Sequence, residues 1–145
     1  MKRIILTTVL IVFSLVSFAQ SRILSVSNGI AQIGKSKTVM SSFLKNKGFE
    51  LEDYSANLFS YKLSTGYGYH TLMLSYKKLK VSGIGWTEHL AYYNHILQEI
   101  NQANFSEKGK YGPSLSFINN KTNKMITVMV KSRTNEIMIN IGTAN

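Results

Sequence analysis

The hydrophobic pattern of this 145-residue chain repeats after 56 residues, and this repeat constrains the fold more than any other feature. In each copy, apolar residues at helical spacing precede three stretches in which apolar and polar residues alternate. Helical spacing predicts an amphipathic helix, and alternation predicts a strand with one buried face. The matched apolar positions are Met40/Ile96, Leu44/Ile100, Phe49/Phe105, Phe59/Leu115, Tyr61/Phe117, Leu72/Val128, Leu74/Val130 and Val81/Ile137. Identical residues are as few as chance gives, so the repeat is one of burial pattern, with or without a true duplication.

The pattern predicts an α+β protein with an antiparallel sheet of about six strands and two helices on one face, in the order αβββ-αβββ. Ser36 and Gly48 suit the start and the stop of the first helix, and Thr87 suits the start of the second. The expected helices are 36–48 and 88–103, and the expected strands are 57–64, 69–77, 80–86, 114–119, 124–132 and 136–142. Residues 21–34 are expected to be irregular or strand, 49–53 could start a further strand, and 106–112 are expected to be a loop.

The first nineteen residues have the composition of an export signal. Lys2 and Arg3 precede an apolar run at 4–16, and Ser17-Phe18-Ala19 is a small-x-small cleavage site. The run has about thirteen residues, whereas a membrane span needs about 20. We therefore expect a bacterial periplasmic or secreted protein with a signal at 1–19, an N-terminal segment at 20–35 and one domain at 36–145, containing the internal repeat 36–86 and 92–142.

The chain contains no cysteine and carries a formal charge of +10, which falls to +8 when Lys2 and Arg3 leave with the signal. Disulfides, thiolate metal ligands and a lipidated cysteine are excluded. Lysines supply most of the charge and lie mainly at expected turns, while the mature part has only Arg22 and Arg133. Because nucleic-acid readout relies on arginine, an acidic protein partner or an anionic envelope polymer is favoured over nucleic acid.

Strand alternation also predicts what the uncovered sheet face carries. The outward positions include aromatic and methionine side chains interleaved with serines and lysines, a mixture that suits contact with a partner. The candidate partner-binding residues are Tyr69, Met73, Trp86, Met125, Met129, Lys62 and Lys80. The alternatives are that residues 21–34 or a second subunit lie across this face as core, so that a homodimer is one reading, or that the face holds a small ligand.

Few residues could carry catalysis, because Asp53 is the sole aspartate and the chain has three histidines. On the expected helix, Glu88, His95 and Glu99 share a face and are weak metal candidates, and a solvated helix face with a His/Glu pair is the favoured interpretation. No G-x-S-x-G elbow supports a triad. The sequence therefore predicts a non-enzymatic protein without metal or cofactor. The rival is a small hydrolase of envelope polymers that uses His70, His89 or His95 as base.

The element order resembles that of PepSY-like and β-lactamase-inhibitor-protein-like exported tandem domains. The resemblance covers residues 36–142 and rests on this order and on the tripeptide Lys47-Gly48-Phe49 that ends the first helix. It implies an interaction or inhibitor module whose open sheet face grips a partner protein. The absence of cysteine departs from the disulfide-bearing inhibitors. An immunity-type protein that neutralises a toxin would differ only in the identity of its partner.

Overall fold

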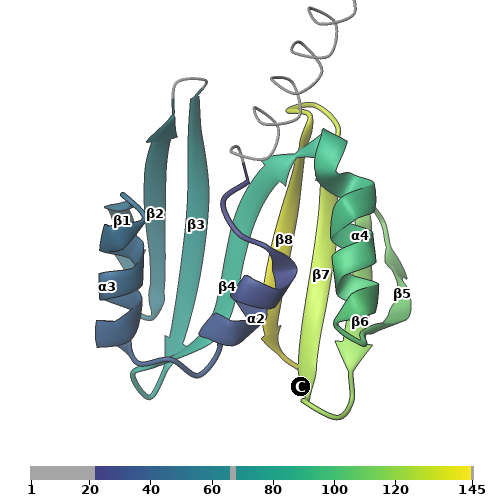
Figure 1. Ribbon diagram of the computed structural model, residues 1–145, viewed down its shortest axis with the longest axis horizontal. Coiled ribbons are helices and arrows are strands. Elements are labelled where there is room, and N and C mark those ends of the chain that lie inside the picture. Colours follow the sequence, from purple (N-terminus) through teal and green to yellow (C-terminus); the bar gives the residue numbers. More distant parts are fainter. Residues whose placement is uncertain (1–21, 66–67, 145) are drawn as a thin grey trace, which may run out of the picture.

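An antiparallel sheet of eight strands forms one layer of the computed structural model, and three α-helices form the other (Figure 1). The structure describes residues 22–65 and 68–144, and these counts refer to them. The helices are α2 (Val26–Gln32), α3 (Lys37–Asn46) and α4 (Tyr93–Gln102), with a 3₁₀ turn, η1, at Leu90–Tyr92. The strands are β1 (Glu50–Ser55), β2 (Leu58–Thr65), β3 (Gly68–Lys77), β4 (Lys80–His89), β5 (Ser106–Tyr111), β6 (Ser114–Asn119), β7 (Lys124–Lys131) and β8 (Glu136–Thr143).

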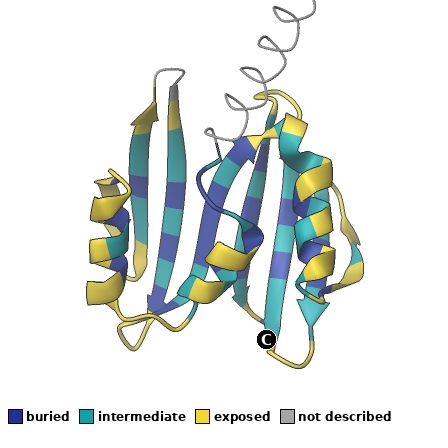
Figure 2. Ribbon diagram, in the orientation of Figure 1, coloured by how far each residue is buried: buried dark blue, intermediate teal, exposed yellow. Residues whose placement is uncertain are grey.

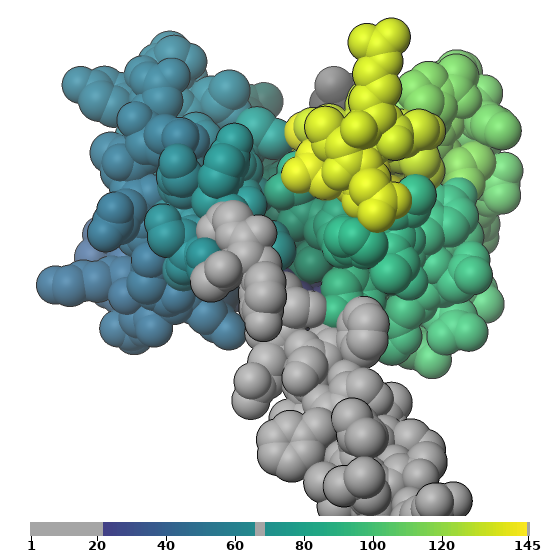
Figure 3. Space-filling view, turned by 90° about the horizontal axis from the view of Figure 1, so that it is seen from above, coloured from purple at the N-terminus to yellow at the C-terminus, as the bar shows by residue number. Residues whose placement is uncertain are grey.

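The predicted α+β class with an antiparallel sheet is confirmed, whereas the predicted six strands and two helices are wrong. The strand order is β1-β2-β3-β4-β8-β7-β6-β5, so β4 and β8 meet at the centre of the sheet. Helix α3 covers the β1–β4 half, α4 covers the β5–β8 half, and α2 lies between them (Figure 1). Seen from above, the two halves lie side by side (Figure 3). Among the described residues, no helix is both long and apolar enough to cross a membrane.

The backbone repeats with the same period as the sequence pattern. Left-handed conformations recur 56 residues apart, at Gly48/Asn104, Ala56/Gly112 and Leu79/Asn135. Both α3 and α4 end in the same hydrogen bond, from Phe49 N to Leu44 O at 3.0 Å and from Phe105 N to Ile100 O at 3.3 Å. The edge hairpins carry matching bulges, between Leu51 and Asp53 and between Glu107 and Gly109. The two halves therefore share their backbone turns as well as their burial pattern.

One pair of strands departs from the 56-residue offset. Leu72 was matched to Val128 by sequence, but Leu72 pairs with Tyr61 whereas the equivalent Phe117 pairs with Ile126. Strand β7 therefore corresponds to β3 at an offset of 54 residues. The reason is that the two hairpins flanking this strand distribute their loop residues differently. Because a slip of two residues returns each side chain to the same face, the buried pattern survives it.

The two strands that the sequence analysis did not predict in full are the outermost ones. Strand β1 is exposed along its whole length, and β5 is exposed apart from Gly109. A strand buried on neither face needs no alternation of apolar and polar residues, so the periodicity signal is absent. The interpretation of residues 106–112 as a loop is therefore wrong, and the short strand suggested at 49–53 is a full edge strand.

The N-terminal segment and the second helix also differ from expectation. Residues 26–32 form helix α2 rather than an irregular or extended segment, and the Oγ of Ser25 caps it by accepting from Asn28 N at 3.2 Å. The second helix does not begin at Glu88, because β4 continues to His89 in its pairing with β8. The helical residues start only at η1 and α4.

The core lies between the helices and the sheet (Figure 2). Helix α3 contributes Met40 and Leu44, and α4 contributes Ile96 and Ile100 at the equivalent positions. These side chains are no more than 2% exposed. They pack on the inward side chains of the sheet, which therefore presents its other face away from all three helices.

Candidate partner-binding face

A β-bulge in β4 decides which side chains of this strand reach the open face. Ser75 pairs with Gly83 while Tyr76 pairs with Val81, so Ser82 is the extra residue. The Oγ atoms of Ser75 and Ser82 lie 3.2 Å apart. A bulge of this kind puts two successive residues on one face and reverses the alternation beyond them. After the bulge, the even-numbered residues of β4 therefore point toward the helices.

Trp86 is one of the residues that this reversal moves. It was predicted to lie on the open face, but it is fully buried on the helix side. A Cβ atom built on Gly29 of α2 would lie 2.9 Å from its Cη2 atom. The assignment of Trp86 to the partner-binding face is therefore wrong. The cause is the inserted Ser82, which simple alternation along β4 does not take into account.

The other predicted residues are exposed or partly exposed. Met73 of β3 and Met125 and Met129 of β7 are half-buried on the face away from the helices. Tyr69 is 61% exposed, and the Nζ atom of Lys62 lies 4.2 Å from its ring centroid. Lys80 is exposed at the end of β4, opposite Lys77. Lys62 lies in β2, and Tyr69 and Lys80 lie near the starts of β3 and β4.

The N-terminal segment does not lie across the open face in the residues that the structure describes. Its helix α2 instead packs on Trp86 and Ile141 on the side of the other helices (Figure 1). The expectation that this segment could serve as a cover for the open face is wrong. None of the three described helices covers that face.

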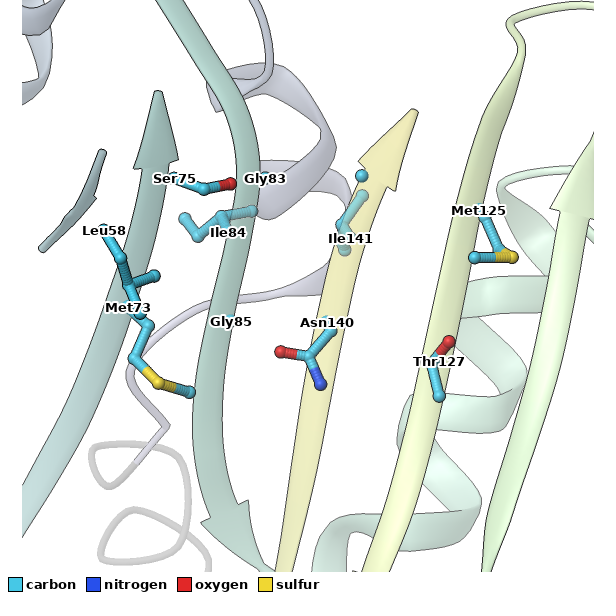
Figure 4. Close-up of a pocket in the computed structure, with 11 residues that line it drawn as sticks. Leu58, Met73, Ser75, Gly83, Ile84, Gly85, Met125, Thr127, Asn140 and Ile141 are labelled. Carbon is cyan, nitrogen blue, oxygen red and sulfur yellow. The ribbon is translucent and has the colours of Figure 1, made fainter. Parts of the chain in front are cut away.

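A hollow of about 280 Å³ lies at the centre of the open face, where β4 meets β8 (Figure 4). Gly83 pairs directly with Gly142, and Gly85 pairs with Asn140. Met73 stands on one side and Met125 on the other. The full lining is Leu58, Met73, Ser75, Gly83, Ile84, Gly85, Met125, Thr127, Asn140, Ile141 and Gly142. The hollow is slightly smaller than the range of about 300–1,000 Å³ that is usual for small-molecule sites.

The lining of the hollow contains no ionisable side chain. Its polar groups are the hydroxyls of Ser75 and Thr127 and the amide of Asn140. Within the described part of the chain, the Asn140 amide makes no hydrogen bond, and its oxygen lies over Gly85 (Figure 4). An amide has both donor and acceptor groups, so Asn140 can hydrogen-bond to whatever enters the hollow.

The predicted metal candidates lie on the helix side, where they bind the N-terminal segment. Arg22 donates to both carboxylate oxygens of Glu99, at 2.7 and 3.1 Å, and Val26 N donates to Glu99 at 2.9 Å. Glu88 accepts from Ile23 N at 3.1 Å. His95 Nε2 lies 3.3 Å from Glu99. Across residues 22–65 and 68–144, no group of three histidine or acidic side chains is placed to hold a metal ion.

The two carboxylates have opposite electrostatic environments. Burial raises the pKa of Glu88 to about 7, although the Arg22 charge and the donors of the N-terminal segment oppose this shift. Burial also acts to raise the pKa of Glu99, but the hydrogen bonds from Arg22 and Val26 outweigh it and hold that pKa below its usual value. Glu88 therefore favours its neutral form in this structure more than Glu99 does.

The histidines proposed as alternative bases contact groups of the chain itself. The Nδ1 atom of His89 accepts from Ala91 N at 3.2 Å, and its Nε2 atom lies 2.9 Å from the Asn135 amide nitrogen. Burial lowers the pKa of His70. Two of the three histidines, His89 and His95, thus contact groups that position neighbouring segments.

Sequence reasoning missed the hollow and the N-terminal clamp. Gly83 and Gly85 belong to β4, whereas Gly142 and Asn140 come from β8, a strand far along the chain. Arg22 had no periodic context that could indicate its contact with Glu99. Comparison of the chain with protein-family models, curated proteins and solved structures found no match. Over residues 22–65 and 68–144, the chain is a two-layer α+β protein in which none of the three helices covers the second face of the sheet.

Proposed function

We propose that this chain is an exported, non-enzymatic binding protein of the inhibitor type, which holds a partner protein against its open sheet face. The observation that carries the proposal is the composition of that face over its central strands. It presents methionine, serine, threonine and asparagine side chains without a charged group at the centre, for example Met73, Thr127, Met129, Met138 and Asn140. Cores of protein interfaces are depleted in charge in the same way and favour methionine.

A protein partner fits this face better than a small molecule does. The hollow is small, at about 280 Å³, whereas the uncharged surface around it extends over several strands. Small ligands require concave sites that bury most of their surface. A broad face with one central hollow instead suits a partner that buries many residues and inserts one of them.

The net charge supports an acidic partner. Lysines lie at the ends of strands and in turns around the neutral centre, as at Lys77, Lys78 and Lys80. A rim of one sign speeds the encounter with a surface of the other sign and contributes less to affinity than the centre does. We expect binding of the partner to slow as salt is raised, because exposed charges are screened.

Export is part of the proposal. The signal at residues 1–19 lies outside the described residues, and its composition is what supports export. Mass spectrometry of the protein from the envelope or medium should give a mature chain that begins at Gln20. A chain that retains residues 1–19 in the cytoplasm would contradict this part of the proposal.

The binding proposal is tested by placing a charge at the centre of the face. Met129→Glu buries a carboxylate in any complex formed there, and Ser42→Glu adds the same group to the exposed side of α3. Capture of the partner from envelope extracts should drop at least tenfold for Met129→Glu and stay unchanged for Ser42→Glu. Equal capture by both variants, with both correctly folded by circular dichroism, would show that the open face does not bind the partner.

A further inference from the structure

The floor of the central hollow has few side chains, because glycines of two paired strands form much of it. Gly83 and Gly85 come from β4, and Gly142 comes from β8 directly opposite Gly83. Asn140 Oδ1 and Ser75 Oγ already lie over the first two, so a Cβ atom at Gly85 or Gly83 would collide with them. Close packing by these neighbours accounts for two of the three glycines.

Gly142 is different. A Cβ atom there would meet only Ser82 O, at 3.5 Å, which is an ordinary contact. Its φ is not in the left-handed region, so neither packing nor backbone conformation requires a glycine at this position. The absence of a side chain at Gly142 leaves space on the open face that the protein itself does not fill.

The sides of the hollow supply chemistry of a particular kind. Met73 and Met125 flank it from β3 and β7 (Figure 4). Thioethers make favourable contacts with aromatic rings and adapt to their shape. The Asn140 amide and the Thr127 hydroxyl provide hydrogen-bonding groups at the same place, and no lining side chain carries a charge.

We infer that this hollow is the anchor site for one aromatic side chain of the partner protein, a tyrosine in preference to an aliphatic residue. The inference rests on the proposed function and names the chemistry of the contact at its centre. A flat ring can lie over Gly142, where no side chain fills the space, with Met73 and Met125 on its two sides, and its hydroxyl can bond to Asn140. Aromatic residues are the usual central anchors of protein interfaces.

Other occupants fit the hollow less well. Sugars and nucleobases are commonly held by stacking on aromatic rings, and the lining contains none. A charged side chain would lose its hydration without gaining a partner of opposite charge. An aliphatic side chain would leave the Asn140 amide without a hydrogen bond in a closed interface.

The test uses NMR signals of methionine methyl groups, because both residues that flank the hollow are methionines. The protein is labelled with ¹³C at the methionine methyls and titrated with N-acetyl-tyrosinamide or N-acetyl-leucinamide. Ring currents should move the signals of Met73 and Met125, while the signal of Met40, which belongs to α3 and is fully buried, stays in place. The tyrosine probe should bind at least fivefold more tightly than the leucine probe.

Two variants make the result specific. Gly142→Val fills the hollow from its floor, and the matched Ser114→Val adds the same side chain elsewhere on the open face. Gly142→Val should weaken tyrosinamide binding at least tenfold, and Ser114→Val should leave it unchanged. If Gly142→Val does not fold, Met73→Ala provides the second test, because loss of one flank should still weaken the response of Met125.

Three outcomes of the titrations would overturn the inference. They are no shift at either methionine at tens of millimolar tyrosinamide, equal responses to the two probes, and binding that survives both Gly142→Val and Met73→Ala. None of these outcomes affects the test of partner capture with Met129→Glu. Failure of the anchor site is therefore distinguishable from failure of the proposed function. Loss of partner capture by Met129→Glu together with normal capture by Gly142→Val would also reject the anchor alone.

Discussion

Gly29 of α2 lies directly against the indole ring of Trp86 in β4. A Cβ atom at Gly29 would lie 2.9 Å from Cη2 and 3.0 Å from Cζ3 of this ring. The contact fixes α2 on the helix side of the sheet and buries the single tryptophan of the chain. It is also the reason that the opposite face is left uncovered by this helix.

The first prediction concerns this contact. Gly29→Ala should destabilise the protein, because overpacking costs about 1–3 kcal/mol and exceeds the gain of up to about 1 kcal/mol in helix propensity. Asn28→Ala, on the exposed side of the same helix, is the control and should be neutral or stabilising. Urea unfolding measures both, and equal midpoints for the two variants would contradict the packing of Gly29 on Trp86.

The second prediction uses tryptophan emission. Because α2 covers Trp86 within one chain, emission should be blue-shifted in the monomer and should not change with protein concentration. Removal of residues 20–33 should shift the emission to the red and increase the quenching of Trp86 fluorescence by iodide. Red-shifted emission from the intact, folded monomer would contradict the burial of Trp86.

The third prediction concerns Glu88. Its pKa is about 7 in the folded protein, whereas the ordinary value, which applies to the unfolded chain, is 4.5. Between these two pH values the folded state therefore binds a proton at Glu88 that the unfolded state has lost. Stability therefore falls as pH rises from about 4.5 to 7 and then levels off, with a total loss of roughly 3 kcal/mol. Glu88→Gln keeps the acceptor for Ile23 N and removes the titration.

Urea unfolding from pH 4.5 to 8 tests this prediction. The variant should match the wild type at low pH and exceed it above pH 7. Glu99 has a lowered pKa, so its own contribution is lost only as pH falls further, and it does not mimic this effect. Parallel stability curves for the wild type and Glu88→Gln would show that the carboxyl does not titrate in this range.

The fourth prediction concerns the clamp on the N-terminal segment. Arg22 and Glu99 are 15% and 18% exposed in their bidentate pair, so Arg22→Ala should cost about 1–3 kcal/mol. The more exposed pair of Lys62 and Glu52, at 3.9 Å, provides the control, and Lys62→Ala should cost at most about 1 kcal/mol. Thermal unfolding compares the two, and a larger loss for Lys62→Ala would contradict the clamp.

Much of the fold followed from periodicity. Alternation at 57–64 and helical spacing at 40 and 44 depend on burial against one neighbouring layer, and local sequence reflects such burial well. The edge strands β1 and β5 could not be predicted in the same way, because their exposed residues have no such pattern. The 56-residue offset matched the buried positions of the two halves but did not indicate the two-residue slip of β7.

The site was predicted less well than the fold. Met73, Met125 and Met129 followed from alternation, while Trp86 failed because one extra residue, Ser82, reverses the faces of β4. A bulge depends on pairing with a neighbouring strand, and sequence alternation alone does not show it. The hollow depends on the β4–β8 contact, which joins residues more than fifty positions apart.

The most direct measurement places a photo-crosslinking residue on the open face in the cells that make the protein. The account predicts that p-benzoylphenylalanine at position 129 gives one discrete heterologous adduct, while the same residue at position 42 on α3 does not. Salt should reduce the yield at position 129. An adduct of twice the mass of the chain, or the same adducts from both positions, would contradict the claim that the open face binds a partner protein.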